Sequence, residues 1–385
     1  MSGRKRIAIL GSTGSIGRQA LEVAAWHPDR FEIVALAARS DAALFREQVR
    51  RFAPRIAALT GRGEDGWCPD ATSLRRGEDS LIEAATAPDV DLLLVATSGT
   101  AGLAPTLAAL ELGRPVALAN KEVLIMAGHL VMRTARRTGA PVIPVDSEHS
   151  AVWQCLFGED RDCVRKVILT ASGGAFRDLP LDQLADVTPA QALQHPNWSM
   201  GPKITVDSAT MMNKGLEVLE ACWLFDLAVD DVEIVLHRES IVHSLVEFVD
   251  GSVKAQLSTP DMRLPIQLAL SYPERISMPT PPLDLVQLGR LSFSPLEPDR
   301  FRSFFLAIEA GRLGGTYPTV MNAANEVAVD LFLSGSIGFG QIPALTEAVM
   351  DRHVPTRDPA LDAVYAADAW AREACRRLAL ASVTA

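Results

Sequence analysis

Two carboxylates stand one residue apart in the stretch Asp146-Ser147-Glu148. The stretch follows the apolar run 141–143, so we expect Asp146 at the end of a short buried strand. If the backbone stays extended there, Asp146 and Glu148 point the same way and aim both carboxylates at one point. Neighbouring anions repel unless a cation or a shared proton lies between them, and hard oxygen ligands favour Mg²⁺ or Mn²⁺ over zinc. For this stretch alone, an ordinary polar turn after a strand is the alternative.

A second cluster lies on a helix that we predict to begin before Met211. Asn213 and Glu217 are one turn apart and share a face, with Lys214 beside them. Lysine before glutamate is the poorer orientation for a helical ion pair, which favours a ligand role over a surface salt bridge. Glu217 would supply a third metal carboxylate. Lys214 and Asn213 would hold a phosphate with Ser208, which we expect near the helix N-terminus, where an anion is favoured.

The elements that must position these groups begin with the apolar run 7–10, which is typical of a buried parallel strand. The glycine-rich turn Gly11-Ser12-Thr13-Gly14-Ser15-Ile16-Gly17 follows, and a helical pattern starts within it. A strand, a glycine turn and a helix in this order let backbone N–H groups and the helix N-terminus hold a pyrophosphate. The spacing is G-x-x-G-x-x-G rather than the usual G-x-G-x-x-G.

Strands alternate with helices as far as about residue 150. The second strand, 33–37, is followed by Arg39 and Ser40, which favour NADP; Asp41 argues mildly against this unless it caps the next helix. Such alternation predicts a doubly wound parallel sheet, in which ligands bind at the carboxyl ends of the strands. Gly11, Arg39, Asn120 and Asp146 all fall at predicted strand ends. Their convergence favours a site over a simple turn at Asp146.

Beyond Ser150 the pattern changes to a mixed α+β domain. A strand over 164–170 leads into Ser172-Gly173-Gly174, a turn that suits a phosphate monoester but is also a common glycine turn. Residues 189–202 lack periodicity, so His195 and Trp198 lie either on a lid or on a structured loop. Strands are predicted over 232–236, 241–248 and 253–257, the last two joined by a hairpin turn. We expect this sheet to pair with a second subunit.

Proline clusters between Pro273 and Pro298, which predicts a linker, and the pattern from Phe301 onward predicts a small helical bundle. The net charge of −10 argues against nonspecific binding to nucleic acid or to an anionic membrane. Five cysteines without a C-x-x-C pair suit a reducing cytoplasm, and we expect neither a signal peptide nor a membrane span.

Several motifs together resemble one enzyme family. They are Gly11–Gly17, Asn120-Lys121-Glu122, Asp146-Ser147-Glu148-His149, Ser172-Gly173-Gly174, the segment 195–201, the segment 211–217, Gly314-Gly315-Thr316-Tyr317-Pro318 and Asn322-Ala323-Ala324-Asn325-Glu326. In this order they resemble the 1-deoxy-D-xylulose 5-phosphate reductoisomerase family over essentially the whole chain. The resemblance implies conversion of that sugar phosphate to 2-C-methyl-D-erythritol 4-phosphate with NADPH and a divalent metal, in non-mevalonate isoprenoid synthesis.

The resemblance also implies a domain order and a set of site residues. The domains are an NADPH-binding domain (1–150), a catalytic and dimerisation domain (151–285), a linker (286–300) and a C-terminal helical bundle (301–385) of a homodimer. The metal ligands implied are Asp146, Glu148 and Glu217. The substrate-binding residues implied are Lys121, Ser147, Glu148, Ser172, His195, Ser208, Asn213, Lys214 and Glu217. The catalytic residues implied are Lys121, His195 and the three metal-binding carboxylates, Asp146, Glu148 and Glu217. The cofactor contacts implied are Thr13, Gly14, Ser15, Ile16, Asn120, Glu122 and Gly201. Arg39 and Ser40 are added as cofactor contacts because of their place after the second strand, although this sequence departs from the family pattern there.

Two alternatives remain at this stage. A semialdehyde-type dehydrogenase also opens with a Thr-Gly turn, but it needs a nucleophilic cysteine, for which Cys155 and Cys163 are the candidates. A non-catalytic NADP-sensing regulator would need the glycine turn but no trio of carboxylates.

Overall fold

The computed structural model of the chain describes residues 3–39, 42–61, 67–77, 79–198, 200–297 and 300–383. These residues form two compact units. Unit 1 comprises Met1–Val123, His129–Ser150 and Asp261–Pro281, and unit 2 comprises Leu124–Gly128, Ala151–Pro260 and Pro282–Ala385. Within the described ranges, no helix combines the length and apolarity that a bilayer crossing requires.

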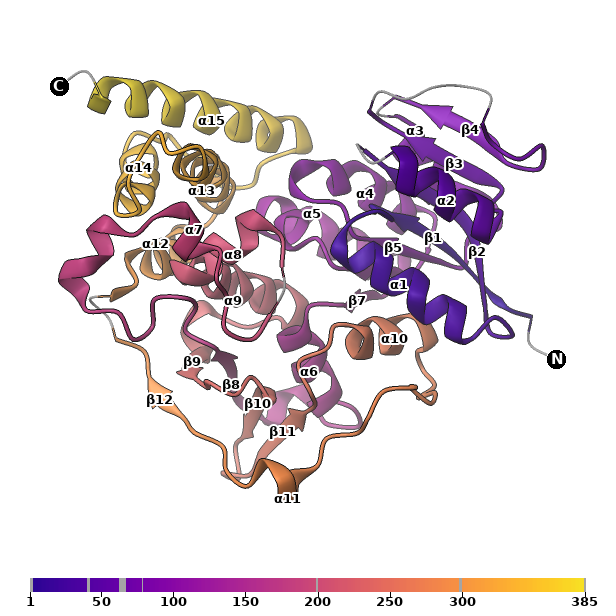
Figure 1. Ribbon diagram of the computed structural model, residues 1–385, viewed down its shortest axis with the longest axis horizontal. Coiled ribbons are helices and arrows are strands. Elements are labelled where there is room, and N and C mark those ends of the chain that lie inside the picture. The colour runs from indigo at the N-terminus through magenta and orange to yellow at the C-terminus, as the bar shows by residue number, and fades with distance from the viewer. Residues whose placement is uncertain are drawn as a thin grey trace. The chain divides into compact units, whose positions relative to one another are not determined.

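Unit 1 is built on a seven-stranded parallel sheet with the strand order β4-β3-β2-β1-β5-β6-β7 (Figure 1). The strands are β1 (Lys5–Leu10), β2 (Phe31–Ala38), β3 (Ile56–Leu59), β4 (Ser73–Arg76), β5 (Leu92–Val95), β6 (Val116–Leu118) and β7 (Val142–Pro144). Its helices are α1 (Ser15–Trp26), α2 (Ala42–Phe52), α3 (Asp79–Thr86), α4 (Leu103–Glu111) and most of α5 (Lys121–Thr138), and the first four residues of α6 (Ser147–Cys155) also belong to it. The run Ile7–Leu10 is fully buried because the central strands are covered on both faces. The predicted doubly wound sheet is confirmed.

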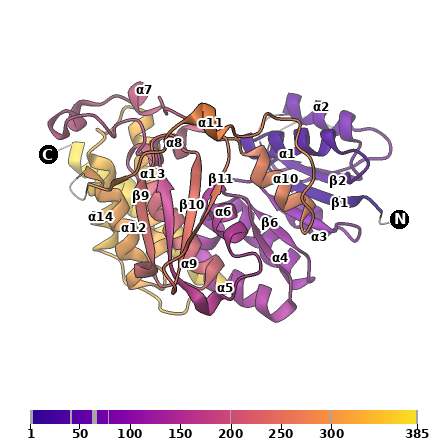
Figure 2. The same ribbon diagram turned by 90° about the horizontal axis from the view of Figure 1, so that it is seen from below.

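A distant segment completes unit 1. Helix α10 (Arg263–Ser271) lies beside α1 in both ribbon views (Figures 1 and 2). Arg263 forms an ion pair with Glu22 of α1 at 2.7 Å, and Lys5 of β1 donates hydrogen bonds to the carbonyl oxygens of Leu270 and Tyr272 at 2.8 and 2.9 Å. Residues 261–281 therefore pack with the N-terminal sheet, whereas the domain order stated with the family resemblance grouped them with the domain at 151–285.

Unit 2 contains a five-stranded mixed sheet with the order β11-β10-β8-β9-β12. Its strands are β8 (Val164–Ala171), β9 (Val232–Leu236), β10 (Val242–Phe248), β11 (Val253–Leu257) and β12 (Ser294–Pro295). Strands β8 and β9 are parallel, and the β10–β11 hairpin is antiparallel as predicted. β12 lies inside the predicted linker, yet it pairs with β9, so this part of the linker is attached to the sheet.

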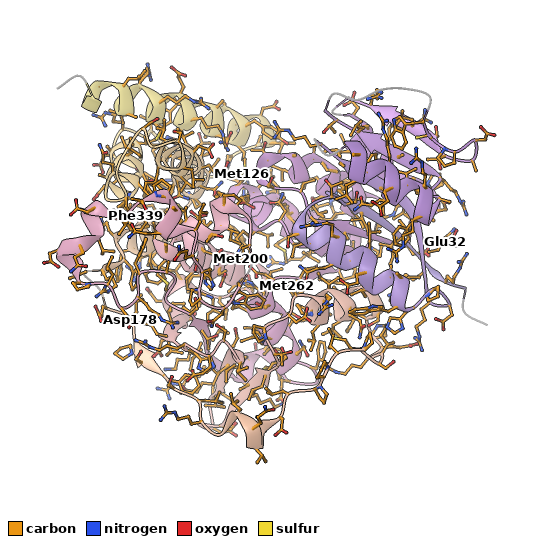
Figure 3. The ribbon with its side chains drawn as sticks, in the orientation of Figure 1. Glu32, Met126, Asp178, Met200, Met262 and Phe339 are labelled. Carbon is orange, nitrogen blue, oxygen red and sulfur yellow. The ribbon has the colours of Figure 1, made fainter. Side chains whose placement is uncertain are left out.

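Helices make up the rest of unit 2. They are α7 (Pro189–Ala192), α8 (Pro202–Ala209), α9 (Met212–Phe225), α11 (Leu285–Leu288), α12 (Arg302–Leu313), α13 (Tyr317–Leu333), α14 (Gln341–Met350) and α15 (Leu361–Val383). Helix α9 packs against α12, and α13 packs against α8, α14 and α15. Phe339, labelled in Figure 3, contacts the rings of Phe176 and Phe332 edge-on. The helices predicted after residue 301 are confirmed, and they share a hydrophobic core with the residues around α8.

Candidate active site

The glycine turn follows β1, where the strand order reverses and doubly wound sheets bind their ligands. Gly11 has φ +87°, and a Cβ there would lie 2.4 Å from the carbonyl oxygen of Ala96. A Cβ on Gly17 would lie 2.2 Å from the carbonyl oxygen of Gly11. Both positions therefore require glycine. Gly14 precedes α1 without a side-chain cap, so the first N–H groups of the helix suit a pyrophosphate oxygen.

The predicted cofactor contacts in this turn surround that helix N-terminus. Gly14 and Ser15 are exposed, and Thr13 and Ile16 are half-buried. Arg39 is exposed at the end of β2, where a 2′-phosphate would be expected. The prediction for Ser40, like the remark on Asp41, falls outside the described residues.

Asn120 lies just beyond the carboxyl end of β6, at the residue before α5, and its side chain makes no capping hydrogen bond to that helix. Its amide nitrogen donates to the hydroxyl of Thr97 at 3.2 Å and to the carbonyl oxygen of Gly99 at 3.0 Å. Its side-chain oxygen is buried and accepts no hydrogen bond from any described residue. A buried acceptor at this edge fits a hydroxyl or amide donor from a dinucleotide. Glu122 follows in the first turn of α5, and Gly201 belongs to unit 2, where it precedes α8.

Just beyond the end of β7, Asp146 forms an ion pair with Lys121. The Lys121 Nζ atom lies 2.6 Å from Asp146 Oδ2, and both side chains are mostly buried. Ser147 donates from its hydroxyl to Glu148 Oε2 at 2.7 Å. The extended backbone expected between Asp146 and Glu148 is wrong, because α6 begins at Ser147 and places Glu148 in its first turn. Strand periodicity therefore does not govern the directions of these two carboxylates.

Helix α9 carries the cluster predicted in unit 2. Asn213 donates to Glu217 Oε1 at 2.6 Å, and the Lys214 ammonium pairs with Glu217 Oε2. Lys214 is only 4% exposed and Glu217 only 1%. The alternative of a surface salt bridge is therefore wrong. Because a buried charged pair costs desolvation free energy that a surface pair does not, its presence suits a functional site.

Ser208 does not lie where the sequence pattern placed it. It is in the last turn of α8, while α9 begins at Met212 after Met211 takes a left-handed conformation with φ +60°. The argument from a helix N-terminus is therefore wrong for Ser208. The helix is anchored by the buried Asp207, which accepts from Asn325 at 2.8 Å and pairs with Lys203 at 2.8 Å.

The Ser172–Gly174 turn packs directly on this end of α8. Gly174 has φ +71°, and a Cβ there would lie 2.3 Å from the carbonyl oxygen of Ser208. The absence of a side chain at Gly174 therefore lets the turn approach the helix backbone. As a result, two of the predicted phosphate-binding segments lie side by side in unit 2.

His195 connects the irregular loop to the same turn. Its Nδ1 accepts from the backbone N–H groups of Asn197 at 3.1 Å and Trp198 at 2.9 Å. The ring proton of the neutral imidazole is therefore on Nε2, which donates to the Ser172 hydroxyl at 3.0 Å. Burial, with a smaller contribution from the positive charge of Arg177, lowers the pKa of His195 to about 4. His195 is thus a neutral donor at neutral pH.

Arg177 is the residue that sequence analysis missed. It lies in an irregular segment five residues after Ser172, without periodicity or a metal-ligand pattern to single it out. Its guanidinium donates to the carbonyl oxygen of Ser172 at 2.8 Å. Only the folded turn reveals this contact.

The cysteines do not support the semialdehyde-dehydrogenase alternative. All five cysteines are free. Burial raises the pKa of Cys155 to about 11, so its thiol is protonated at neutral pH. Cys163 is exposed and immediately precedes β8, outside the clusters of predicted site residues.

The predicted site residues thus form clusters within each unit. Lys121, Asp146, Ser147 and Glu148 cluster in unit 1, while the Ser172 turn, His195 and Ser208 form one cluster in unit 2 and Asn213, Lys214 and Glu217 another. The meeting of Glu217 with Asp146 and Glu148 remains a prediction.

A doubly wound parallel sheet with a glycine turn at the point where the strand order reverses is the architecture of a dinucleotide-binding domain, the class found in NAD(P)-dependent oxidoreductases. Family models described as 1-deoxy-D-xylulose 5-phosphate reductoisomerase, its C-terminal domain and the DXP reductoisomerase C-terminal domain match residues 7–128, 142–225 and 257–374. A relative of that name from Thermomicrobium roseum is 52% identical over 377 residues, covering 97% of this chain and 98% of the relative. The chain belongs to the 1-deoxy-D-xylulose 5-phosphate reductoisomerase family.

A further relative and two solved structures support the same family membership. The reductoisomerase of Geobacillus kaustophilus is 52% identical over 381 residues, covering 97% of this chain and 99% of that protein. The Zymomonas mobilis enzyme in complex with NADPH superposes with a TM-score of 0.91 at 40% identity, covering 98% of this chain and 99% of that one. A DOX-P reductoisomerase in complex with NADPH, fosmidomycin and magnesium gives a TM-score of 0.91 at 39% identity, covering 97% and 98%.

Proposed function

We propose that this chain converts 1-deoxy-D-xylulose 5-phosphate to 2-C-methyl-D-erythritol 4-phosphate with NADPH and a divalent cation, as a step of non-mevalonate isoprenoid synthesis. Its family relationship and the NADPH, fosmidomycin and magnesium complexes of similar enzymes support this reaction. Within the chain, the observation that carries the assignment of the site is the buried Asn213–Lys214–Glu217 cluster on α9.

We assign Asp146, Glu148 and Glu217 as the ligands of the divalent cation. All three offer carboxylate oxygens, the donors that Mg²⁺ and Mn²⁺ prefer. Asp146 and Glu217 each pair with a lysine ammonium, so the protein already balances part of their negative charge with cations. This donor set fits a small hard cation better than zinc, which favours nitrogen and sulfur ligands.

We assign the substrate phosphate to the cluster around the Ser172–Gly174 turn. The hydroxyls of Ser172 and Ser208, the amide of Asn213 and the ammonium of Lys214 would hold it. Lys121, Ser147 and His195 would contact the rest of the substrate. The segment from His195 to Trp198 would close over the bound molecule and exclude water, driven by phosphate binding remote from the reacting carbons.

We assign the NADPH pyrophosphate to the N-terminus of α1, with Thr13, Gly14, Ser15 and Ile16 around it. Asn120 and Glu122 would contact the cofactor at the end of β6, Arg39 and Ser40 would contact the 2′-phosphate, and Gly201 would contact the cofactor from unit 2. The buried side-chain oxygen of Asn120, which accepts no hydrogen bond within the described part of the chain, supports its role.

The residues would divide the chemistry among them. When bound, the cation polarises the adjacent carbonyl and hydroxyl oxygens of the substrate, and NADPH supplies the hydride. Lys121, hydrogen-bonded to Asp146, and Glu148, hydrogen-bonded to Ser147, are placed to hold or move a proton during the retroaldol–aldol rearrangement. Neutral His195 donates through Nε2 and keeps Ser172 in position.

The decisive assay is NADPH consumption with 1-deoxy-D-xylulose 5-phosphate, with and without a chelator. We expect turnover that chelation abolishes. Absence of metal-dependent NADPH oxidation would favour the NADP-sensing regulator instead.

Glu217→Gln tests the metal assignment. Loss of one carboxylate charge should raise the half-saturating Mn²⁺ concentration by about tenfold or more, measured by turnover and by the electron paramagnetic resonance of free Mn²⁺. Glu373→Gln, on the exposed side of α15, is the control and should match wild type. A Glu217→Gln enzyme with wild-type metal dependence would show that Glu217 is not a ligand.

We also propose a homodimer in the cytoplasm. The edge strand β11 is exposed over Val253–Ala255, and the five cysteines are free, as suits a reducing compartment. Light scattering of the purified chain tests the first proposal, and fractionation of the producing cells tests the second. A monomer at assay concentration, or recovery outside the cytoplasmic fraction, would refute the corresponding proposal.

A further inference from the structure

We propose that Arg177 is a positioning residue of the phosphate subsite, which braces the Ser172–Gly174 turn from behind and strengthens the donors that the turn presents. The inference deepens the proposed function, because it rests on the assignment of this turn to the substrate phosphate. It adds a residue that does not itself touch the substrate.

Arg177 contacts the turn and also the neighbouring Asp178, whose Oδ2 lies 3.4 Å from the Arg177 Nε atom. Its Nη1 donates to the carbonyl oxygen of Ser172 at 2.8 Å. Its aliphatic stem covers Gly173, where a Cβ would lie only 2.8 Å from the Cβ of Arg177. The Arg177 side chain is 19% exposed. Both ends of this side chain therefore fix the turn, one through a charge-assisted hydrogen bond and the other through packing.

The bond to Ser172 has a directional consequence. In a trans peptide the N–H points opposite to the C=O, so the N–H of Gly173 points away from Arg177. A hydrogen bond from a cation to the carbonyl polarises the peptide group and makes its N–H a stronger donor. An anion on the far side of the turn therefore gains from Arg177 without touching it.

The Ser172 hydroxyl is organised in the same way. It accepts from His195 Nε2 at 3.0 Å and from the N–H of Gly174 at 3.3 Å, which leaves its own proton to be donated to an anion. A neutral ring is needed for His195 Nδ1 to accept from the N–H groups of Asn197 and Trp198 while Nε2 donates to Ser172. Burial opposes protonation of the ring, and the positive charge of Arg177 adds to this effect.

Two sets of contacts connect the Ser172–Gly174 turn and its neighbour Asp178 with the loop that carries His195 and Asn197. Asn197 donates to the carbonyl oxygen of Arg238 at 2.7 Å, and the Arg238 guanidinium pairs with Asp178 at 2.8 Å. Asp178, labelled in Figure 3, is the residue next to Arg177. Because the loop also reaches Ser172 through His195, a displaced Arg177 would loosen both the turn and the loop.

The test compares Arg177→Met, which keeps the stem and removes the charge, with Arg177→Lys and with the control Arg377→Met on the exposed side of α15. For Arg177→Met we expect KM for 1-deoxy-D-xylulose 5-phosphate to rise about tenfold, with kcat and KM for NADPH within about twofold of wild type. The pKa of His195, followed by NMR of its ring, should rise from about 4. Arg177→Lys should keep the low pKa of His195 and show a smaller rise in KM, because it retains the charge but loses the planar fork.

Some outcomes would overturn the inference. A folded Arg177→Met enzyme with wild-type KM does so, as does one that loses kcat at unchanged KM. If circular dichroism shows that Arg177→Met is unfolded, Arg177→Lys decides, and wild-type KM in that variant refutes the bracing role. These failures differ from failure of the proposed function, in which the wild-type enzyme itself does not oxidise NADPH with the sugar phosphate.

Discussion

Gly174→Ala should separate the phosphate turn from α8. Two effects, backbone strain and a steric clash, would destabilise an alanine at this position. Gly174 has φ +71°, where a residue with a side chain is strained by about 1–2 kcal/mol. The added Cβ would also lie 2.3 Å from the Ser208 carbonyl oxygen and 2.8 Å from the Ala209 Cα, both backbone atoms that cannot rotate away.

The size of the effect follows from these distances. A carbon and an oxygen in contact stay about 3.3 Å apart, so the turn must retreat from the Ser208 carbonyl by about 1 Å. Forcing an extra methyl group into a packed contact typically costs a further ~1–3 kcal/mol. A displacement of about 1 Å among groups that position a substrate can lower kcat/KM by about 10²-fold.

Gly335→Ala provides the matched control. Gly335 also lies in unit 2 and has φ +74°, but a Cβ there meets no atom within 4 Å. It should therefore show the conformational strain alone, at about 1–2 kcal/mol of unfolding free energy, with wild-type kinetics.

Urea unfolding and steady-state kinetics of both variants test the reasoning. We expect Gly174→Ala to be less stable than Gly335→Ala and to lose kcat/KM for the sugar phosphate while KM for NADPH stays unchanged. Equal stability and equal kinetics in the two variants would mean that the close approach of the turn to α8 is unimportant.

Two further predictions concern His195 and the dinucleotide turn. Because the folded pKa of His195 is lowered from 6.5 to about 4, the unfolded chain binds the proton first, and folding stability falls as pH decreases from 6.5 towards 4. Stability should therefore fall between pH 7 and pH 5, and urea unfolding of His195→Gln should lack that part of the pH slope; an unchanged slope would refute the assignment. Gly17→Ala would place a Cβ 2.2 Å from the Gly11 carbonyl oxygen and should raise KM for NADPH, whereas Gly113→Ala, with no atom within 4 Å, should not. Equal KM values for NADPH in these two variants would remove the reason for placing the cofactor at this turn.

Local patterns predicted the alternation of strands and helices in unit 1 because strands such as β1 and β2 are specified by nearby residues, whereas β3 and β4 were not singled out. The buried run 7–10 and the glycine turn after it need only hydrophobic periodicity and backbone geometry to be recognised. The two glycines that the turn requires, Gly11 and Gly17, can be read from the sequence, although their close backbone contacts appear only in the structure. The same holds for the β10–β11 hairpin, whose Asp250-Gly251 pair marks the turn.

Local patterns failed where two neighbouring elements competed. Asp146 ends a strand run, and an extended continuation was expected, but α6 begins at the next residue. Ser208 was assigned to the start of one long helix, but Met211 adopts a left-handed conformation and divides the segment into α8 and α9. Periodicity is the same on both sides of such a break, so it does not show where one helix ends and the next begins.

By itself the sequence determined the types of element, the dinucleotide turn, the family and which side chains could serve as metal or phosphate ligands. The tertiary structure decided the packing of residues 261–281 on unit 1, the burial of the Lys214–Glu217 pair, the tautomer of His195 and the place of Arg177 behind the phosphate turn. The physical reason is that periodicity and turn chemistry act over a few residues. Desolvation and hydrogen-bond partners depend on which distant segments come together, and for Arg177 on the path of an irregular turn.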